Sequence, residues 1–399
     1  MNILVTGANG FVGKNLVVAL EQVRNGNDKT RNRLQIDEVF CYDIDSTEEE
    51  FEYYCSECDF VFNLAGVNRP KNSQEFFDGN FSFLSDLLKT LARYGNRCPV
   101  MLSSSIQATL LGRYADSDYG KSKLAAEQLL DRYGQEMGVP TYIYRFPNLF
   151  GKWCRPNYNS VVATFCNAYA HDQRITVNDP NAELELVYID DLVKEMLDIL
   201  EGKEHRCEYY GLSFSQKENG HYCYVPTFYR MTVGQIAQCL DLIKKQPQTL
   251  LVPELKRNGF IKKLYSTYLS YLPIEKTIFD LKTNFDERGS FTELVKTMTG
   301  GQFSVNITKP GVIKGQHFHN SKWEFFIVVK GRALIRERNL ATDDIYEFVV
   351  SDDKLQAVHM LPGYTHSIQN IDNEEELITL MWANELFDKN HPDTFREEV

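Results

Sequence analysis

Two residues of the segment 119–123 could move a proton near neutral pH: Tyr119 and Lys123. They stand four residues apart, so a helix would place both on one face, about a turn apart. An ammonium group lowers the pKa of a neighbouring phenol from its ordinary value of about 10, which makes the phenol a workable acid or base. Serines stand at the carboxyl end of a predicted strand over 99–108, and a serine hydroxyl could fix a substrate carbonyl. The pattern predicts acid–base chemistry on a carbonyl group.

The chain opens with an apolar strand, a glycine-rich turn and a helical pattern, in the run NILVTGANGFVGKNLVVAL. Gly7 allows a sharp turn after the strand, Gly10 lets the backbone approach a pyrophosphate, and Gly13 lets a helix pack closely on the strand. The start of that helix, at Phe11 and Val12, offers backbone N–H groups and a positive dipole end to phosphates. We therefore expect a bound dinucleotide.

The second predicted strand, 38–45, bears on the identity of that dinucleotide. Asp43 stands at its carboxyl end, where an acid commonly holds the ribose 2′-hydroxyl of NAD. The polar insert 26–35 could instead fold over the adenine end and offer Arg31 or Arg33 to the 2′-phosphate of NADP. Both cofactors therefore stay open.

A third predicted strand, 59–66, ends in residues that we expect to line the dinucleotide site: Leu64, Ala65 and Gly66. The last two are small, so the loop can pass close to a cofactor. These residues and the glycine-rich turn predict a dinucleotide-binding fold for the N-terminal half.

The glycines, the serines and the Tyr-x-x-x-Lys pair together resemble the short-chain dehydrogenase/reductase superfamily, and in particular its extended branch, which modifies nucleotide sugars. The resemblance implies an α/β fold, a Rossmann-type doubly wound parallel sheet. It also implies catalytic roles for Ser105, Tyr119 and Lys123, with Lys123 binding the cofactor as well. Ser104 is the second choice for the serine, and we expect it to contact the substrate.

The segment 142–153 resembles the Arg-x-x-Asn-x-x-Gly stretch at which the substrate region of the extended branch begins. The resemblance implies a substrate lobe over about 150–280. Asn148, Arg155 and Asn157 are then candidate contacts for phosphate or sugar hydroxyls.

Two further positions refine this resemblance. Sugar 4,6-dehydratases carry an acid pair where this chain has Ile106 and Gln107, and dehydration needs those acids, so a dehydratase is excluded. Asn80 matches a position that often supports the active-site backbone, although an ordinary polar helix residue explains it equally well.

Beyond Pro273 the pattern changes to short alternating strands with Gly and Pro turns, which predicts an all-β sandwich or jelly roll. Within it, His317 and His319 would project from one face of a strand and Glu324 follows. His366 supplies a fourth ligand, and such a set suits Zn²⁺ or another divalent metal. The spacing resembles the two-motif signature of the cupin superfamily.

The chain length of 399 residues exceeds the ~150 residues of an average domain, so we expect two domains. The change of pattern places the boundary near 280. Residues 1–280 would form the NAD(P)-binding reductase domain with its substrate lobe, and residues 281–399 the cupin domain.

Composition excludes several partners. The net charge is −12 with no basic run, which argues against nucleic acid. No apolar window is long enough to span a membrane. The nine cysteines are an odd number and scattered, which indicates reduced thiols in a cytoplasmic protein.

A reductase fused to a cupin, together with the runs DERGSFTE and KPGVIKGQHFHNSKWEFF, resembles the CapF-type enzymes of capsular polysaccharide synthesis over nearly the whole chain. The resemblance implies a UDP-linked 4-keto-6-deoxy-N-acetylhexosamine as substrate. The cupin would epimerise C3 and the reductase would then reduce C4, giving UDP-N-acetyl-6-deoxy-talosamine, towards UDP-N-acetyl-L-fucosamine. That family typically uses NADPH, whereas Asp43 favours NADH. We also expect a homodimer.

Three points stay open at this stage. The general base of the cupin could be Lys314, Lys322, Tyr364 or a metal-bound water. The enzyme could instead be a UDP-sugar 4-epimerase that recycles bound NAD, with a purely structural cupin. A sugar-nucleotide sensor without turnover is a further alternative, which the intact Tyr119 and Lys123 argue against.

Overall fold

The chain forms two compact units in a computed structural model that describes residues 1–70 and 72–399. The first unit comprises Met1–Leu240 with Lys262–Leu272, and the second comprises Asp241–Ile261 with Pro273–Val399. These units divide the chain differently from the expected boundary near 280. The second unit begins its main stretch at Pro273 and also takes in Asp241–Ile261, which lies inside the expected reductase domain.

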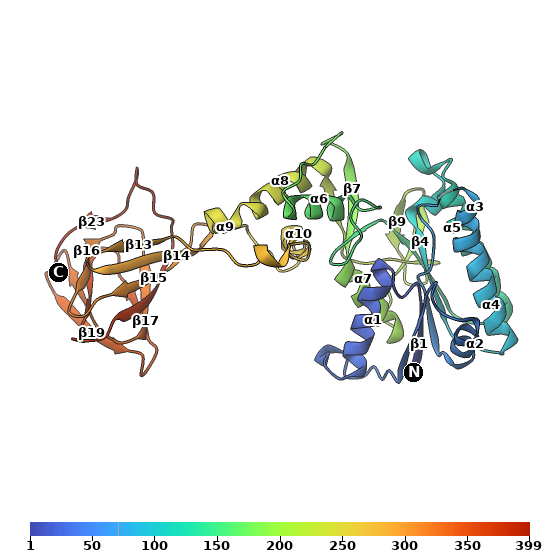
Figure 1. Cartoon of the computed structure of the whole chain (residues 1–399), viewed down its shortest axis with the longest axis horizontal. Helices are drawn as coiled ribbons and strands as arrows, with labels where there is room; N and C mark the ends of the chain where they lie inside the picture. The colour runs from blue at the N-terminus through green and yellow to red at the C-terminus, as the bar shows by residue number, and fades with distance from the viewer. Residues whose placement is uncertain (71) are drawn as a thin grey trace. The chain divides into compact units, whose positions relative to one another are not determined.

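The first unit is built on a parallel sheet with helices on both faces. Its strands follow the order β2-β1-β3-β4-β5-β10-β8-β9, parallel from β2 to β10 and antiparallel at the edge formed by β8 and β9. Helices α1 and α7 cover one face, and α2, α4 and α5 cover the other (Figure 1). The predicted Rossmann-type doubly wound sheet is confirmed, with an antiparallel edge added.

The strands of this sheet are β1 (Asn2–Thr6), β2 (Glu38–Tyr42), β3 (Phe60–Asn63), β4 (Val100–Ser105), β5 (Thr141–Phe146), β8 (Arg206–Tyr210), β9 (Ser213–Gln216) and β10 (Tyr222–Cys223). A smaller sheet has the order β11-β7-β6 and consists of β6 (Asn148–Phe150), β7 (Glu183–Tyr188) and β11 (Tyr229–Thr232). The helices are α1 (Phe11–Arg24), α2 (Glu48–Glu57), α3 (Gln74–Phe77), α4 (Phe83–Arg93), α5 (Asp118–Met137), α6 (Val161–Ala170) and α7 (Ile189–Leu200). Helices α8 (Val233–Lys244) and α10 (Phe260–Leu269) run from one unit into the other.

Side-chain alternation along β1 explains why helices pack on both faces. Ile3 and Val5 join the apolar core under α1 and α7, whereas Leu4 joins the core under α2, α4 and α5. All three side chains are fully buried. A strand that is apolar on both faces is typical of a parallel sheet covered on both sides.

The strand order reverses between β1 and β3, because β1 leads to β2 on one side and the later strands follow on the other. In open α/β sheets, ligands bind in the crevice outside the carboxyl ends of the strands at such a point. The turn after β1 is tight: Gly7 has a φ of +67°, and a Cβ at Gly13 would lie 2.2 Å from the carbonyl oxygen of Gly7. Both positions therefore require glycine.

The second unit is a β-sandwich of two mainly antiparallel sheets. One has the order β12-β14-β15-β22-β17-β20, with β13 paired to β14, and the other has the order β19-β18-β21-β16-β23. Buried apolar residues of both sheets form its core, among them Phe326, Val328, Ile335 and Ile368. The predicted all-β jelly-roll class is confirmed.

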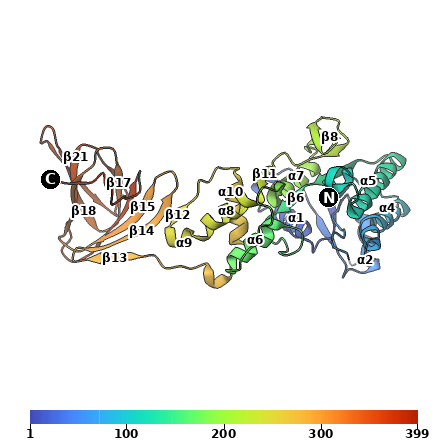
Figure 2. The same ribbon diagram turned by 90° about the horizontal axis from the view of Figure 1, so that it is seen from above.

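The elements of the second unit are α9 (Gln246–Thr249), β12 (Leu251–Val252), β13 (Thr283–Asp286), β14 (Gly289–Thr297), β15 (Gln302–Thr308), β16 (Ile313–Phe318), β17 (Glu324–Lys330), β18 (Arg332–Asn339), β19 (Ile345–Ser351), β20 (Ala357–Met360), β21 (Tyr364–Asn370), β22 (Leu377–Ala383) and β23 (Phe395–Arg396). Strand β12 pairs in parallel with β14 (Figure 2). This pairing is the reason that Asp241–Ile261 belongs to the second unit. None of the helices that the structure describes is long and apolar enough to cross a membrane.

Arg31 connects the polar insert 26–35 to helix α7 by hydrogen bonds and does not face the cofactor site. Its guanidinium is 8% exposed and donates to Asp198 at 2.6 Å, to Glu201, and to the backbone oxygen of Lys194 at 3.2 Å. These bonds use three of the five N–H donors of the guanidinium and hold it in a buried place. Arg31 is therefore removed as a candidate for the 2′-phosphate of NADP.

Replacing Arg31 with alanine should lower the free energy of unfolding of the first unit by about 2 kcal/mol, because buried carboxylates lose a partner. Affinity for NADPH should not change. The exposed Arg24, which pairs with Glu21 within α1, gives a matched control, since Arg24→Ala should cost less than about 0.5 kcal/mol. Chemical denaturation and a nicotinamide titration measure both quantities, and weaker NADPH binding by Arg31→Ala would contradict the structural role.

Candidate functional site

Ser105, Tyr119 and Lys123 meet at the carboxyl end of β4. Ser105 is the last residue of β4, and α5 begins at Asp118 with Ser117 as its cap, whose hydroxyl accepts the Gly120 N–H at 2.9 Å. The Lys123 ammonium lies 5.8 Å from the centre of the Tyr119 ring and donates to the Ser103 backbone oxygen at 2.9 Å. The structure thus brings the three expected catalytic residues together.

Burial controls the charge of this group. It raises the pKa of Tyr119 to about 12, with a hydrogen bond to Ser105 acting in the opposite direction. It lowers the pKa of Lys123 to about 8. The expectation that Lys123 brings the phenol pKa below its ordinary value is therefore corrected, because burial outweighs the effects that lower it. Near neutral pH the phenol is protonated and the ammonium is charged, which suits Tyr119 to giving a proton.

Asn80 supports the loop that follows β3. It lies in a π-helical turn, and its side chain accepts the Val67 N–H at 3.1 Å and donates to the Val67 backbone oxygen at 2.9 Å. It also donates to the Ser122 hydroxyl on α5 at 3.0 Å. A Cβ at Gly66 would lie 2.5 Å from the Asn80 side-chain oxygen and 3.1 Å from the Lys123 ammonium. The geometry favours the supporting role of Asn80 and explains why Gly66 must be small.

Ser104 faces away from this group, which corrects its assignment as a substrate contact. Its side chain is 3% exposed, and its hydroxyl donates to the Glu127 carboxylate. Glu127 also accepts from the Arg145 guanidinium at 2.6 Å. Because successive side chains of a strand point to opposite faces, only one of two neighbouring serines can face the site.

The expected cofactor residues gather at the carboxyl ends of β1, β2 and β3. Helix α1 begins at Phe11, and its cap residue, Gly10, has no side chain that could compete for the first N–H groups, including that of Val12. Asp43 follows β2 directly, and its carboxylate accepts the N–H of Asn9 at 2.7 Å and the N–H of Ile44 at 2.8 Å. Asp43 is thus tied to the glycine-rich turn. Leu64, Ala65 and Gly66 follow β3, and the Ala65 N–H donates to the Thr6 hydroxyl at 3.3 Å.

The three expected substrate contacts that remain fall into two places. Asn148, on β6, lines a cavity of about 530 Å³ that also contains Ile106, the residue after Ser105. Arg155 lies in the loop 151–159 with its guanidinium 5.2 Å from the centre of the Tyr158 ring. Asn157 has a φ of +55°, and its N–H donates to the Thr164 hydroxyl at 3.0 Å.

Two residues near Tyr119 were missed by sequence reasoning. Tyr158 lies close enough to raise the pKa of Tyr119, and the Arg69 guanidinium sits 5.5 Å from the centre of the Tyr158 ring. Arg69 also donates to the Asn159 side chain at 2.8 Å. Neither residue belongs to a motif with fixed spacing, so the sequence contains no signal that could have found them.

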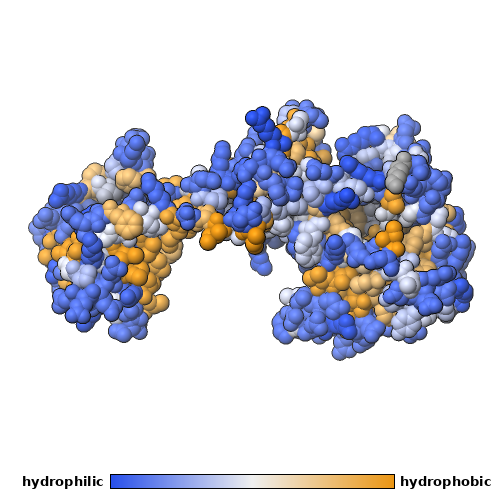
Figure 3. Space-filling model, in the orientation of Figure 1, coloured by the Kyte–Doolittle hydropathy of each residue, from blue (hydrophilic) through white to orange (hydrophobic). Residues whose placement is uncertain are grey.

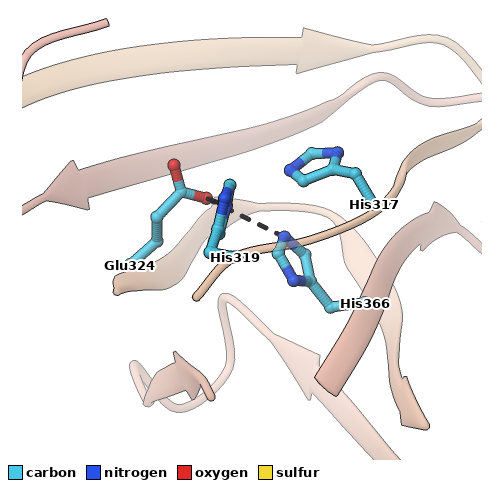
Figure 4. A group of neighbouring side chains, drawn as sticks. All are labelled: His317, His319, Glu324 and His366. Atoms are coloured by element: carbon cyan, nitrogen blue, oxygen red, sulfur yellow. Dashed lines mark ion pairs between the residues drawn. The ribbon is translucent and has the colours of Figure 1, made fainter. Parts of the chain in front are cut away.

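In the second unit, His317, His319, Glu324 and His366 form one buried cluster (Figure 4). One side-chain atom of each lies within 4.8 Å of the corresponding atom of every other. His317 on β16 pairs in register with His366 on β21, His319 follows β16, and Glu324 opens β17. The expected four-residue set is thus assembled from three strands.

The donor atoms of this cluster fit a divalent cation. Among the described residues, buried nitrogens without a hydrogen-bond partner include Nε2 of His319 and both ring nitrogens of His366. Burial lowers the pKa of His366 to about 3 and also lowers that of His317. Although burial opposes it, the charge of the Lys322 ammonium, 2.7 Å from the carboxylate, lowers the pKa of Glu324 to about 2. Neutral imidazoles and an ionised carboxylate are the forms that bind metal.

A cavity of about 730 Å³ opens onto this cluster and is lined by His317, Glu324 and Lys322. Lys322 forms an ion pair with Glu324 at 2.7 Å. The other two side chains named as candidate bases are not among the described residues that line this cavity. The Lys314 ammonium is buried and donates to Asn306 at 2.6 Å, and the Tyr364 hydroxyl accepts from Asn339 at 3.0 Å. Lys322 is therefore the side chain that stays a candidate base.

Comparison with known proteins finds relatives for both parts of the chain. Residues 3–209 match the NAD dependent epimerase/dehydratase family, and residues 284–395 match the polysaccharide biosynthesis C-terminal domain. The crystal structure of the capsular polysaccharide assembling protein CapF from Staphylococcus aureus is 44% identical, with a TM-score of 0.86 and full coverage of both chains. The chain belongs to the CapF family. Its first unit accordingly belongs to a nicotinamide-dependent family.

Two further relatives extend this comparison. A UDP-2-acetamido-2,6-beta-L-arabino-hexul-4-ose reductase of Pseudomonas aeruginosa is 39% identical over 99% of this chain and 98% of its own length. The UDP-glucose 4-epimerase of Thermotoga maritima is 20% identical, with a TM-score of 0.52 over 69% of this chain and 99% of its own. The second likeness concerns the fold alone.

Proposed function

We propose that the chain is a bifunctional enzyme acting on a UDP-linked 4-keto-6-deoxy-N-acetylhexosamine. Its cupin unit epimerises C3, and its reductase unit then reduces the C4 ketone to give UDP-N-acetyl-6-deoxy-talosamine, towards UDP-N-acetyl-L-fucosamine for capsule or O-antigen. The observation that carries the reductase half is the full-length similarity to a reductase whose name specifies a 2-acetamido-hexul-4-ose.

The residues at the end of β4 suit reduction of a ketone. A nicotinamide bound at the switch point supplies the hydride. Tyr119, protonated because burial raises its pKa to about 12, gives a proton to the C4 oxygen as the hydride arrives at C4. Ser105 holds that oxygen by a hydrogen bond. The Lys123 ammonium then stabilises the phenolate that remains.

The cavity of about 530 Å³ beside Ile106 suits the nucleotide end of the substrate. Aromatic side chains form part of its wall and could stack on uracil, among them Phe214 and Phe228. Arg113 and Arg230 line the same cavity and could pair with the diphosphate. Because the chain as a whole is acidic, with a net charge of −12, it must bind such an anion through a few cationic side chains in the cavity.

The order of the two reactions follows from the chemistry of the ketone. A C4 ketone acidifies the proton at C3, so a base can remove that proton and return it from the other face. Once C4 is reduced, that acidity is lost, so epimerisation must come first. A divalent cation held by the His/Glu cluster would polarise the ketone or keep the shape of the cavity. Lys322 lines the same cavity, and to take the C3 proton it would first have to lose its own, because its ammonium pairs with Glu324 at 2.7 Å.

We propose NADPH as the cofactor, with NADH possible. Membership of the CapF family supports NADPH, because the resemblance to CapF-type enzymes implies the cofactor that they typically use. Asp43 at the end of β2 favours NADH, since its carboxylate stands where a 2′-phosphate would be repelled. Its bond to the N–H of Asn9 gives this carboxylate a structural role as well.

We also propose that the chain is a homodimer that pairs through its second unit. The outward side chains of β15, β22 and β17 are apolar and in register, for example Val305, Leu380 and Ile327. Each of these three is only partly buried. Apolar side chains gather on this side of the unit, over β15 and β17 (Figure 3). A second copy would cover such a face, because obligate interfaces are apolar.

Tyr119→Phe should reduce the rate of NADPH oxidation by the 4-keto sugar by about 10²- to 10⁴-fold, since no proton reaches the C4 oxygen. The same variant should retain exchange of the C3 proton, which the cupin unit catalyses. Tyr133→Phe is the matched control: it lies on the same helix, and its buried hydroxyl has no hydrogen-bond partner.

Spectrophotometry follows NADPH oxidation, and mass spectrometry follows exchange. Loss of exchange in Tyr119→Phe would contradict the assignment of exchange to the cupin unit. Turnover without net oxidation of nicotinamide would favour the alternative of a 4-epimerase with a structural cupin.

Leu380→Glu should convert the dimer into a monomer, because a charge would be buried at the centre of the apolar face. Leu269→Glu, at an exposed leucine of the first unit, should leave the dimer intact. Light scattering of the purified chains measures the mass. A wild-type chain that is monomeric at micromolar concentration would refute the dimer.

A further inference from the structure

The segment 391–399, called the strap here, runs along the strand that carries His317. Its strand β23 pairs antiparallel with β16, so that His317 faces Arg396 and Phe318 faces Phe395. The Phe318 and Phe395 rings stack with their centres 5.1 Å apart. Beyond this pair, the Glu397 N–H donates to the Gln316 backbone oxygen at 3.1 Å. The strap is thus an added strand on the edge of the sheet that holds two of the cluster residues.

Asp393 binds the loop that joins His319 to Glu324. Its carboxylate accepts the backbone N–H groups of Asn320 at 2.9 Å, Ser321 at 2.7 Å and Lys322 at 2.8 Å. The Ser321 hydroxyl donates to the same carboxylate at 3.0 Å. Successive backbone N–H groups that converge on one carboxylate fix the path of a loop, because hydrogen bonds to a charged acceptor are strong.

The backbone oxygen of Asp393 acts on His319 itself, through a short contact with Nδ1 of its ring. A carbonyl oxygen only accepts hydrogen bonds, so the ring proton must sit on Nδ1. The lone pair is then on Nε2, which is buried without a partner and lies 3.6 Å from the Glu324 carboxylate. The strap therefore selects the tautomer of His319 that can bind a cation.

This arrangement distinguishes His319 from the histidine that faces it. Among the described residues, neither ring nitrogen of His366 has a hydrogen-bond partner, so none of them selects its tautomer from outside the cluster. The Thr394 hydroxyl lies 3.4 Å from Nδ1 of His319, and Thr394 also lines the cavity of about 730 Å³. The strap thus reaches both a cluster ligand and the wall of the cavity.

We propose that Asp393 is a positioning residue for the metal ligand His319, and that docking of the strap and binding of the metal stabilise each other. The inference rests on the proposed metal site and not on the proposed reactions. Groups that orient a ligating imidazole typically change metal affinity about 10- to 100-fold when they are removed. Because docking of the strap and binding of the metal favour each other, bound metal should protect the strap from proteolysis. Loss of the Asp393 carboxylate should in turn weaken metal binding.

The test uses the intact chain, stripped of metal and titrated with Co²⁺, whose visible absorption reports the number and geometry of its ligands. Asp393→Ala keeps the backbone oxygen but loses the carboxylate that fixes the strap beside His319. It should bind Co²⁺ about 10- to 100-fold more weakly than the unchanged chain and with an altered spectrum. Asp372→Ala is the matched control, since the Asp372 carboxylate likewise accepts backbone N–H groups, of Glu374 at 2.8 Å and of Glu375 at 2.9 Å, outside the strap and the cluster. It should match the unchanged chain in both respects.

A second measurement separates positioning from misfolding. Asp393→Asn keeps one acceptor for the loop and should recover part of the Co²⁺ affinity and spectrum. Trypsin should cut the unchanged chain after Lys389 or Arg396 more slowly with Co²⁺ than with a chelator, and Asp393→Ala should lose this protection. NADPH oxidation by Asp393→Ala reports whether the first unit is intact.

Equal Co²⁺ affinity and equal spectra for Asp393→Ala and the unchanged chain would overturn the inference. Failure of the unchanged chain to bind Co²⁺ through histidine would overturn it together with the metal site. The proposed reductase would stand in either case, because Tyr119→Phe tests it separately.

Discussion

The cost of removing charge from water governs both candidate sites. At the end of β4, burial keeps the Tyr119 phenol protonated and brings the pKa of Lys123 down to about 8. In the second unit, burial keeps His366 neutral, whereas the charge of Lys322 keeps Glu324 ionised against the effect of burial. One physical effect thus prepares an acid in the first unit and a set of cation ligands in the second. The surrounding elements serve this effect: Asn80 and Gly66 hold the loop against Lys123, and β23 closes the sheet beside His317.

The sequence was informative wherever a site depends on residues close together in the chain. The glycine-rich turn, the pair Tyr119 and Lys123, and the spacing of His317 and His319 are local patterns with a fixed geometry, so both fold classes could be predicted. Errors arose where a partner lies far away in the chain. Ser104 was taken for a substrate contact because its bond to Glu127 is not visible in the local pattern. Arg31 was left open as a contact for NADP because its partners, Asp198 and Glu201, lie far away in the chain, at the end of α7.

The same limit explains the division into units and the missed role of Asp393. Pairing of β12 with β14 attaches Asp241–Ile261 to the β-sandwich, although the surrounding sequence belongs to the reductase. Asp393 stands more than seventy positions beyond the loop that it binds, in a short polar segment without a motif. The residues of both candidate sites are therefore mostly local in sequence, whereas the residues that support them are distant. Two separate sites are what the two proposed reactions on one ketone would need.

The central claim is that one chain carries out both reactions, with epimerisation independent of nicotinamide. The most direct measurement incubates the unchanged chain with the UDP-linked 4-keto sugar in D₂O without nicotinamide, and follows deuterium at C3 by NMR. The account predicts that deuterium enters at C3 before NADPH is added. Added NADPH should then be oxidised in an amount equal to the ketone present, and deuterium uptake should stop as the ketone is consumed. Absence of deuterium at C3 before NADPH is added, with reduction still proceeding, would contradict it.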